Sequence, residues 1–259
     1  MTFGSLFAGI GGLDLGLERA GMECKWQVEI DDYARRVLAK HWPNVRRWDD
    51  IKTFPTDALR PKWEPGPRGR RIRESNPQPS PWIVDLICGG FPCQDISTAG
   101  KRAGLHGDRS GLFFEAIRVV ELLQPRWLLL ENVAGLLARG LDEVLGTLAS
   151  IGFDAEWHCL QAADFGAPHI RDRVFIIANA NGQHHRPGND GDAATFRAAT
   201  ESRKAGGKIQ PCEWWATQPE LGRVAHGIPS RVDRLRGIGN AVVPQIAEWI
   251  GRQIMEADN

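Results

Sequence analysis

The sequence has no excess of charge of either sign, no long hydrophobic run and no paired-cysteine motif. Its 32 basic and 32 acidic residues cancel to a formal net charge of zero, so any charged partner must be met by a local patch. None of the 5 cysteines forms a Cys-x-x-Cys motif or shows zinc-site spacing. The N-terminus does not resemble a signal peptide, and no stretch approaches the roughly 18 apolar residues of a membrane span. We therefore expect a reduced, cytoplasmic protein that binds neither metal nor membrane.

The remaining composition is that of an ordinary globular chain, with 42% hydrophobic and 25% charged residues in 259. This excludes collagen-like, disordered and disulfide-scaffold classes, and the length allows one or two domains. Glycine is enriched: 29 residues, where the usual share of about 7% would give about 18. Extra glycine indicates tight loops in which the backbone approaches a ligand closely.

Strand and helix patterns alternate along the chain. Short apolar runs predict strands, helical periodicity predicts helices between them, and Asp31 is the expected N-cap of the second helix. Nearly continuous apolar runs are typical of parallel strands buried on both faces. The pattern predicts an α/β, Rossmann-like fold with a mostly parallel sheet. The expected strands are 2–7, 25–29, 83–87, 127–130 and 174–178, and the expected helices are 13–20, 32–41, 112–123 and 141–151.

Two polar stretches interrupt this pattern. Residues 60–81 are rich in Pro, Gly and Arg and predict a basic loop inserted into a main domain of residues 1–178. Residues 179–236 are polar and form a candidate smaller module. Residues 237–259 are expected to return to the main domain, because Pro244 suits the first turn of a helix with one apolar stripe.

The first glycine-rich turn is a candidate ligand site. Gly9, Gly11 and Gly12 follow the first strand, where a doubly wound sheet binds nucleotide-like ligands. Asp14 stands in place of the third glycine of the dinucleotide motif, and no Walker lysine follows. Glu29, at the end of the second strand, is placed to accept hydrogen bonds from ribose hydroxyls. A purely structural turn remains the alternative.

Three further positions carry candidate chemistry. Cys93 follows a Gly-Gly-Phe-Pro loop at a strand end, where a thiol of lowered pKa can act as a nucleophile. Glu131 ends another strand and can donate a proton near neutral pH if an apolar pocket raises its pKa. Arg171 and Arg173 precede a strand, and their spacing places both on one face. The alternatives are a small buried cysteine, a solvated or helix-capping carboxylate, and a surface salt-bridged pair with Asp172 and Asp164.

The order of these segments is specific. The chain resembles the C5-cytosine DNA methyltransferase family through FAGIGGLDLG (7–16), Glu29, DDI (49–51), GGFPCQDIS (89–97), ENV (131–133), HIRDR (169–173) and RLRGIGNAVVP (234–244). The family often has Gln where His169 stands and an aromatic residue where Ile30 stands.

This resemblance implies roles for individual residues. Cys93 would be the nucleophile, Glu131 the group at cytosine N3, Arg173 a partner of O2, and Arg171 a support for the same loop. S-adenosylmethionine would be the cofactor, with Glu29 at its ribose and Asp50 at its adenine. Its full set of contacts would be Phe7, Gly9, Gly11, Gly12, Glu29, Asp50, Ile51, Gly90, Pro92, Leu112, Asn240 and Val242.

The partner implied is duplex DNA, whose target cytosine must be flipped out of the helix. The loop 94–109 is expected to close over that base, and residues 179–236 to read the sequence around it. The expected DNA contacts are Ser97, Lys101, Arg102, Arg223, Arg231 and Arg234. We expect a monomer, encoded alone, on a phage or beside a restriction endonuclease.

Other functions remain open at this point. A same-fold enzyme could methylate cytosine in tRNA, and a non-catalytic DNA-binding protein could retain the pocket. The joint presence of Cys93, Glu131 and Arg173 argues against the second. Asp14 and the Cys/Glu pair disfavour a nicotinamide oxidoreductase.

Overall fold

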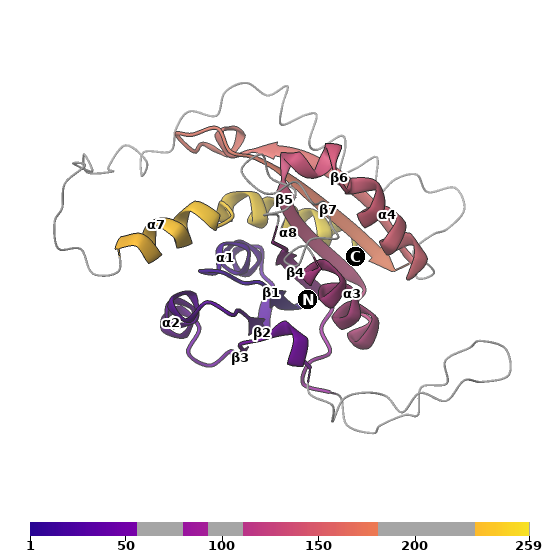
Figure 1. The fold of residues 1–259 in the computed structure, drawn as a ribbon, viewed down its shortest axis with the longest axis horizontal. Coiled ribbons are helices and arrows are strands. Elements are labelled where there is room, and N and C mark those ends of the chain that lie inside the picture. The colour runs from indigo at the N-terminus through magenta and orange to yellow at the C-terminus, as the bar shows by residue number, and fades with distance from the viewer. Residues whose placement is uncertain (56–79, 93–110, 181–230, 259) are drawn as a thin grey trace, which may run out of the picture.

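The computed structural model describes residues 1–55, 80–92, 111–180 and 231–258 (Figure 1). Seven strands form one sheet in the order β3-β2-β1-β4-β5-β7-β6. Their bounds are β1 Thr2–Leu6, β2 Glu23–Val28, β3 Arg46–Trp48, β4 Leu86–Gly90, β5 Trp127–Val133, β6 Phe153–Gln161 and β7 Asp172–Ala180. The helices are α1 Gly12–Arg19, α2 Asp32–His41, α3 Leu112–Leu123, α4 Leu141–Ser150, α7 Arg231–Asn240 and α8 Pro244–Ala257, with short 3-10 turns η1 Ile51–Thr53, η4 Ala134–Ala138 and η5 Ala162–Phe165.

The strand order reverses beside β1. The chain adds β2 and β3 on one side of β1, then crosses to add β4 and β5 on the other, and all these pairs are parallel. A crevice therefore opens beyond the carboxyl ends of β1 and β4, where doubly wound sheets bind ligands. The expected Rossmann-like α/β fold with a mostly parallel sheet is confirmed.

Two hydrophobic cores cover the two faces of the sheet. Successive residues of β5 alternate between them: Trp127 and Leu129 pack with α1 and α8, whereas Leu128 and Leu130 pack with α3 and α4. This is why the strand is apolar at nearly every position. The stripe of α8 (Ile246, Ile250 and Ile254) is buried, and α8 packs along α1.

Several local expectations match the structure, and others were wrong. Asp31 caps α2 by accepting a hydrogen bond from the Ala34 N–H at 2.9 Å. The strand expected at 83–87 begins three residues later, and Ile83 is 43% exposed. Gly89 and Gly90 belong to this strand, and Gly89 has to be glycine because a Cβ there would lie 2.6 Å from the Leu6 carbonyl oxygen.

The strand expected at 174–178 is not parallel to its neighbours. As β7 it runs antiparallel to both β5 and β6. β6, which the apolar-run criterion missed, leads through η5 straight back into β7, so this pair needs no crossover helix. The reversal brings the first residues of β7 to the edge of the sheet where β5 ends, with Arg173 opposite Val133.

Parts of the sequence-based prediction lie outside the described residues. They include 60–79 of the basic insert, Cys93, the loop 94–109 and most of the 179–236 module. Among the described residues, no helix is long and apolar enough to cross a membrane.

Candidate functional site

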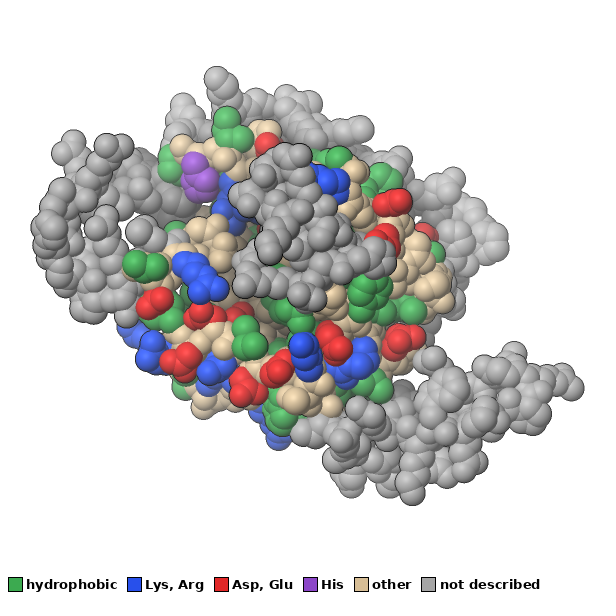
Figure 2. All heavy atoms as spheres, in the orientation of Figure 1, with side chains coloured by type: hydrophobic (Ala, Val, Ile, Leu, Met, Phe, Trp, Pro, Cys, Tyr) green, Lys and Arg blue, Asp and Glu red, His purple; other side chains and the backbone are tan. Residues whose placement is uncertain are grey.

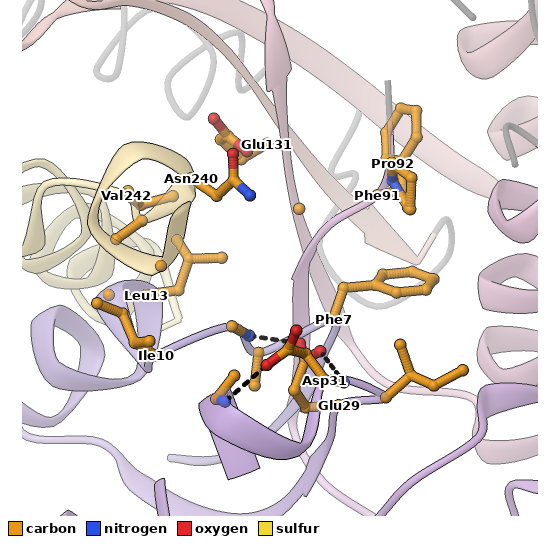
Figure 3. Close-up of a pocket in the computed structure, with 18 of the residues that line it drawn as sticks. Phe7, Ile10, Leu13, Glu29, Asp31, Phe91, Pro92, Glu131, Asn240 and Val242 are labelled. Carbon is orange, nitrogen blue, oxygen red and sulfur yellow. Dashed lines mark hydrogen bonds between the residues drawn. The ribbon is translucent and has the colours of Figure 1, made fainter. Parts of the chain in front are cut away.

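A cavity of about 560 Å³ opens at the switch point of the sheet, a size typical of small-molecule sites. Figure 3 shows residues from widely separated segments converging on it: Phe7 and Glu29 at one end, Glu131 and Pro92 at the other, and Asn240 and Val242 from the C-terminal segment. Of the expected cofactor residues, all but Gly11 line this cavity. Gly11 lies beside it, as the N-cap of α1.

The glycine-rich turn forms the floor of one end. Phe7 has φ 52° and Gly9 and Gly11 have φ 56° and 86°, so the chain turns sharply through left-handed conformations. Such a φ is uncommon for a bulky residue like Phe7 and is typical of functional loops. At Gly11 a side chain would also meet Trp42, since a Cβ would lie 2.5 Å from its ring.

Glu29 is fixed by the loop that surrounds it. Its two carboxylate oxygens accept hydrogen bonds from the Gly9 N–H at 2.7 Å and from the Asp31 N–H at 2.8 Å (Figure 3). Each oxygen keeps a second lone pair for a ligand hydroxyl. The carboxylate is therefore oriented before any ligand arrives.

The turn η1 forms the next wall. Asp50 caps η1 by accepting a hydrogen bond from the Lys52 N–H at 2.9 Å, and Ile51 is buried. β2 holds this wall close to Glu29, because the Glu29 N–H donates to the Trp48 carbonyl at 3.0 Å. Leu112, the first residue of α3, completes this side of the cavity.

The C-terminal segment closes the cavity. Gly12 approaches it so closely that a Cβ would lie 2.4 Å from the Val242 carbonyl oxygen. Arg171 donates a hydrogen bond to the Gly239 carbonyl at 2.6 Å, near the end of α7. Its Nε and Nη2 are buried and have no hydrogen-bond partner among the residues that the structure describes, and burial lowers its pKa. Arg171, which directly precedes β7, thus links this strand to the C-terminal segment next to Asn240.

An ion pair lies at the other end of the cavity. Arg173 Nε is 2.9 Å from Glu131 Oε1, and both side chains are largely buried. Burial raises the pKa of Glu131, while Arg173 and Arg171 oppose that shift. Glu131 therefore holds a proton to a higher pH than a solvated glutamate does.

The strand context of this pair differs from the sequence-based expectation. β5 continues to Val133, so Glu131 lies within the strand rather than after it, and Arg173 lies within β7. Gly90 on the neighbouring strand makes room for the carboxylate, because a Cβ there would lie 2.8 Å from Glu131 Oε2.

Asn132, which the sequence analysis did not single out, anchors the loop that leads to Cys93. Its Nδ2 donates to the Phe91 carbonyl at 3.3 Å, and its Oδ1 accepts from the Val133 N–H at 2.8 Å. The buried Asn132 thus ties the end of β5 to the residue before Pro92. Its place between Glu131 and Val133 in the ENV motif was the available signal.

Only two of the six expected DNA contacts fall within the described residues. Ser97, Lys101, Arg102 and Arg223 lie outside the described residues. Arg231 and Arg234 fall in α7, and Arg234 is exposed. The described residues contain no group of three or more His, Cys, Asp or Glu side chains arranged to hold a metal ion.

Comparison with known proteins identifies the family. The model of the C-5 cytosine-specific DNA methylases matches residues 1–211. The chain belongs to this family. It is 34% identical over 183 residues to the Type II methyltransferase M2.BsuMI of Bacillus subtilis, covering 68% of the chain and 41% of that protein. It is 31% identical over 192 residues to M.AquIA of Picosynechococcus, covering 69% of the chain and 72% of that protein.

Solved structures of the methylase fold agree. A prophage-encoded E. coli protein described as a candidate DNA modification methyltransferase is 27% identical, with a TM-score of 0.51 over 70% of this chain and 47% of its own. S. pombe Dnmt2, 19% identical, shares the fold with a TM-score of 0.53 over 72% of this chain and 53% of its own. The chain spans 41% and 36% of the lengths of M2.BsuMI and M.HgiCII of Herpetosiphon aurantiacus, and 72% of M.AquIA.

Proposed function

We propose that this methylase-family protein transfers a methyl group from S-adenosylmethionine to C5 of a flipped cytosine in a specific duplex DNA sequence. The observation that carries the proposal is one cavity with two chemically distinct ends. The end at the glycine-rich turn presents a fixed carboxylate, and the end at β5 and β7 presents a buried Glu131–Arg173 pair. The cavity therefore suits two ligands that meet in its middle.

The charges around the cavity favour this cofactor over a dinucleotide. Among the described residues, acidic side chains outnumber basic ones in its lining whether or not Glu131 carries its proton: Glu29, Asp31, Asp49, Asp50, Glu131 and Asp233 against Lys52, Arg171, Arg173 and Arg236. Two of the four cations, Arg171 and Arg173, are engaged at the far end with Gly239 and Glu131. An acidic wall suits a cationic sulfonium and repels a pyrophosphate.

The residues that line the cavity would hold the cofactor. Glu29 would accept hydrogen bonds from the ribose hydroxyls, and Asp50 and Ile51 would contact the adenine. Phe7, Pro92, Leu112, Asn240 and Val242 would enclose it, Gly9, Gly12 and Gly90 would let the backbone approach closely, and Gly11 would shape the turn beside it. When bound, it supplies an electrophilic methyl group.

The base-binding end would activate the cytosine. The Cys93 thiolate would add to C6, and the electron pair of the C5–C6 double bond would form the new bond from C5 to the methyl carbon. The bond between that carbon and the cofactor's sulfur would break at the same time, and a neutral thioether would leave. Glu131, carrying its proton, donates to N3, and Arg173 stabilises charge at O2. Loss of the C5 proton to a base and return of the N3 proton to Glu131 would then restore the double bond and expel the Cys93 thiolate.

Duplex DNA would be bound around this opening. We propose that residues 179–236 recognise the sequence, and that Ser97, Lys101, Arg102, Arg223, Arg231 and Arg234 contact the DNA. The main domain would be 1–178, completed by 237–259. The protein would act as a cytoplasmic monomer, in a host or phage context where a restriction endonuclease of the same specificity is a natural companion.

Base-resolution sequencing of 5-methylcytosine tests the proposal. Host and plasmid DNA would be taken from cells expressing the chain, with Cys93→Ala as the matched control. We expect methylation at one short motif, absent from the control. A soluble, folded protein that leaves DNA unmethylated would contradict the proposal and direct the same assay to tRNA.

A further inference from the structure

Arg118 lies outside the cavity lining, yet its guanidinium contacts the η1 wall of the cavity. It belongs to α3, six residues after Leu112, which itself lines the cavity. At 1.5 Å per residue the two positions are about 9 Å apart along the helix. The Arg118 side chain leaves α3 toward η1, against which the helix packs.

Arg118 is partly buried and makes three hydrogen bonds. Its Nη2 donates to the Ile51 carbonyl at 2.6 Å and to the Phe54 carbonyl at 2.7 Å. Its Nε is 2.8 Å from Glu115 Oε2 on the same helix. One nitrogen thus bridges the start of η1 and the residue that follows it, while the carboxylate orients the guanidinium plane.

These two carbonyls belong to the wall that carries Asp50 and Ile51. The carboxylate of Asp50 is itself used to cap η1 through the Lys52 N–H. Its position therefore follows the position of the turn. The residue that follows η1, Phe54, is buried against Trp26, with their ring centroids 4.8 Å apart. Both the Arg118 hydrogen bonds and this aromatic contact therefore hold η1 in place.

We propose that Arg118 is a positioning residue for the cofactor: it holds η1 at the distance from α3 at which Asp50, Ile51 and Leu112 can enclose one ligand. This inference rests on the proposed function, because it assigns Asp50 and Ile51 to the adenine side of the bound cofactor. Arg118 touches no reacting atom. Its effect belongs to cofactor affinity and leaves the Glu131–Arg173 end unchanged.

Full-length Arg118→Gln and Arg118→Lys variants test the assignment. Arg252→Gln is the matched control, since Arg252 also pairs with a glutamate of its own helix, Glu248 at 2.7 Å. It belongs to α8, which packs in the other hydrophobic core from Ile51 and Phe54. Binding of S-adenosylhomocysteine would be measured by calorimetry, and methyl transfer to plasmid DNA by steady-state kinetics. Thermal melting would establish that each variant folds.

We expect Arg118→Gln to raise the Kd for S-adenosylhomocysteine and the KM for S-adenosylmethionine about tenfold, the order that loss of charge-assisted hydrogen bonds produces. The kcat and the KM for DNA should stay within about twofold of wild type. Arg118→Lys should be intermediate, because an ammonium can donate to the carbonyls but lacks the planar fork that Glu115 orients.

Each other outcome counts against one specific claim. If Arg118→Gln and Arg252→Gln bind S-adenosylhomocysteine with the same Kd, the positioning role is overturned. It is also overturned if kcat falls by as large a factor as the KM for S-adenosylmethionine rises. Failure of both Arg118 variants to fold would overturn it too, by making Arg118 a general structural residue. A wild-type protein that binds S-adenosylhomocysteine but methylates no DNA would instead overturn the proposed function and leave the calorimetric comparison intact.

Discussion

At the scale of single residues, the site depends on a glycine whose missing side chain leaves room for a carboxylate. Gly90 has no side chain, and Glu131 uses that space to meet Arg173 at 2.9 Å. The carboxylate is buried and held by its partner, so it has little freedom to step aside. A single methyl group added at Gly90 should therefore disturb the base-binding end without entering the core.

We expect Gly90→Ala to lower kcat about tenfold or more, because small misplacements of catalytic groups cost large factors in rate. Gly146→Ala in α4 is the control, since nothing lies within 4 Å of a Cβ there. Steady-state methyl transfer to plasmid DNA would measure both variants. A kcat for Gly90→Ala within twofold of wild type would show that Glu131 can move without cost.

Asp14 makes a separate prediction about stability. It is fully buried in α1, where it accepts hydrogen bonds from Ser5 at 3.0 Å and from Gln27 at 2.8 Å. Burial nevertheless raises its pKa to about 6 from 3.8. The folded state therefore binds this proton more tightly than the unfolded chain, and the contribution to stability is full below about pH 4 and lost as pH rises through 6.

A shift of this size corresponds to about 3 kcal/mol in the free energy of unfolding. Asp14→Asn has no proton to lose, so its stability relative to wild type should improve between pH 4.5 and pH 8 by about 2 kcal/mol, since about a third of the effect is already lost at pH 4.5. Urea unfolding at several pH values would measure the difference between the two proteins. Parallel pH profiles would mean that Asp14 does not titrate in this window.

At the scale of elements, local signals were sufficient where one segment determines its own structure. α2 spans Asp32–His41 and α3 spans Leu112–Leu123, as the cap and the periodicity predict. The direction of β7 was mispredicted because strand polarity depends on the partner strand, not on the apolar run. The contacts of Arg118 were equally invisible, since its two carbonyl partners are 67 and 64 residues away in the chain.

The candidate site shows the same division. Motif order was enough to nominate Glu131 and Arg173, but their pairing needs the antiparallel β5–β7 register. The residues of the first glycine-rich turn were recognisable because a strand precedes them and a helix follows. Asn132 was overlooked because its role is to hold a backbone carbonyl, and no spacing rule encodes that.

The close packing of α1 on α8 predicts that a side chain added between the two helices destabilises the protein. A Cβ at Gly16 would lie 2.3 Å from the Pro244 carbonyl oxygen and 2.4 Å from the Ala247 Cβ. We expect Gly16→Ala to destabilise the protein by about 1–3 kcal/mol through overpacking. Gly146→Ala should instead stabilise it by about 0.5–1 kcal/mol, because it gains helix propensity without a clash.

Urea unfolding compares the two glycine variants directly. α8 begins two residues after Val242, which lines the cavity, so a displaced α8 should also displace Val242. Gly16→Ala should therefore weaken binding of S-adenosylhomocysteine, whereas Gly146→Ala should not. Equal stabilisation by both substitutions would mean that α1 and α8 can separate at no cost.

At the scale of the whole molecule, charge is balanced overall and divided locally. On the face in Figure 2, acidic and basic side chains of the described residues intermingle, in keeping with the net charge of zero. The cavity has an acidic excess, whereas the stretch 60–81 carries six basic and two acidic residues. Binding of the cofactor and binding of DNA should therefore respond differently to salt.

We expect DNA affinity to fall steeply with salt, because each neutralised phosphate releases a counterion and contributes about 0.9 to the slope of log affinity against log salt. The five basic residues proposed to contact DNA set an upper slope of about 4.5 in magnitude. Binding of S-adenosylhomocysteine, which involves no polyanion, should change little over the same range. Fluorescence anisotropy with a duplex and calorimetry with the small ligand, both from 50 to about 300 mM KCl, would measure the two slopes. A slope near zero for log DNA affinity against log salt would contradict recognition through phosphate contacts, because it would mean that few phosphates are neutralised when the duplex binds.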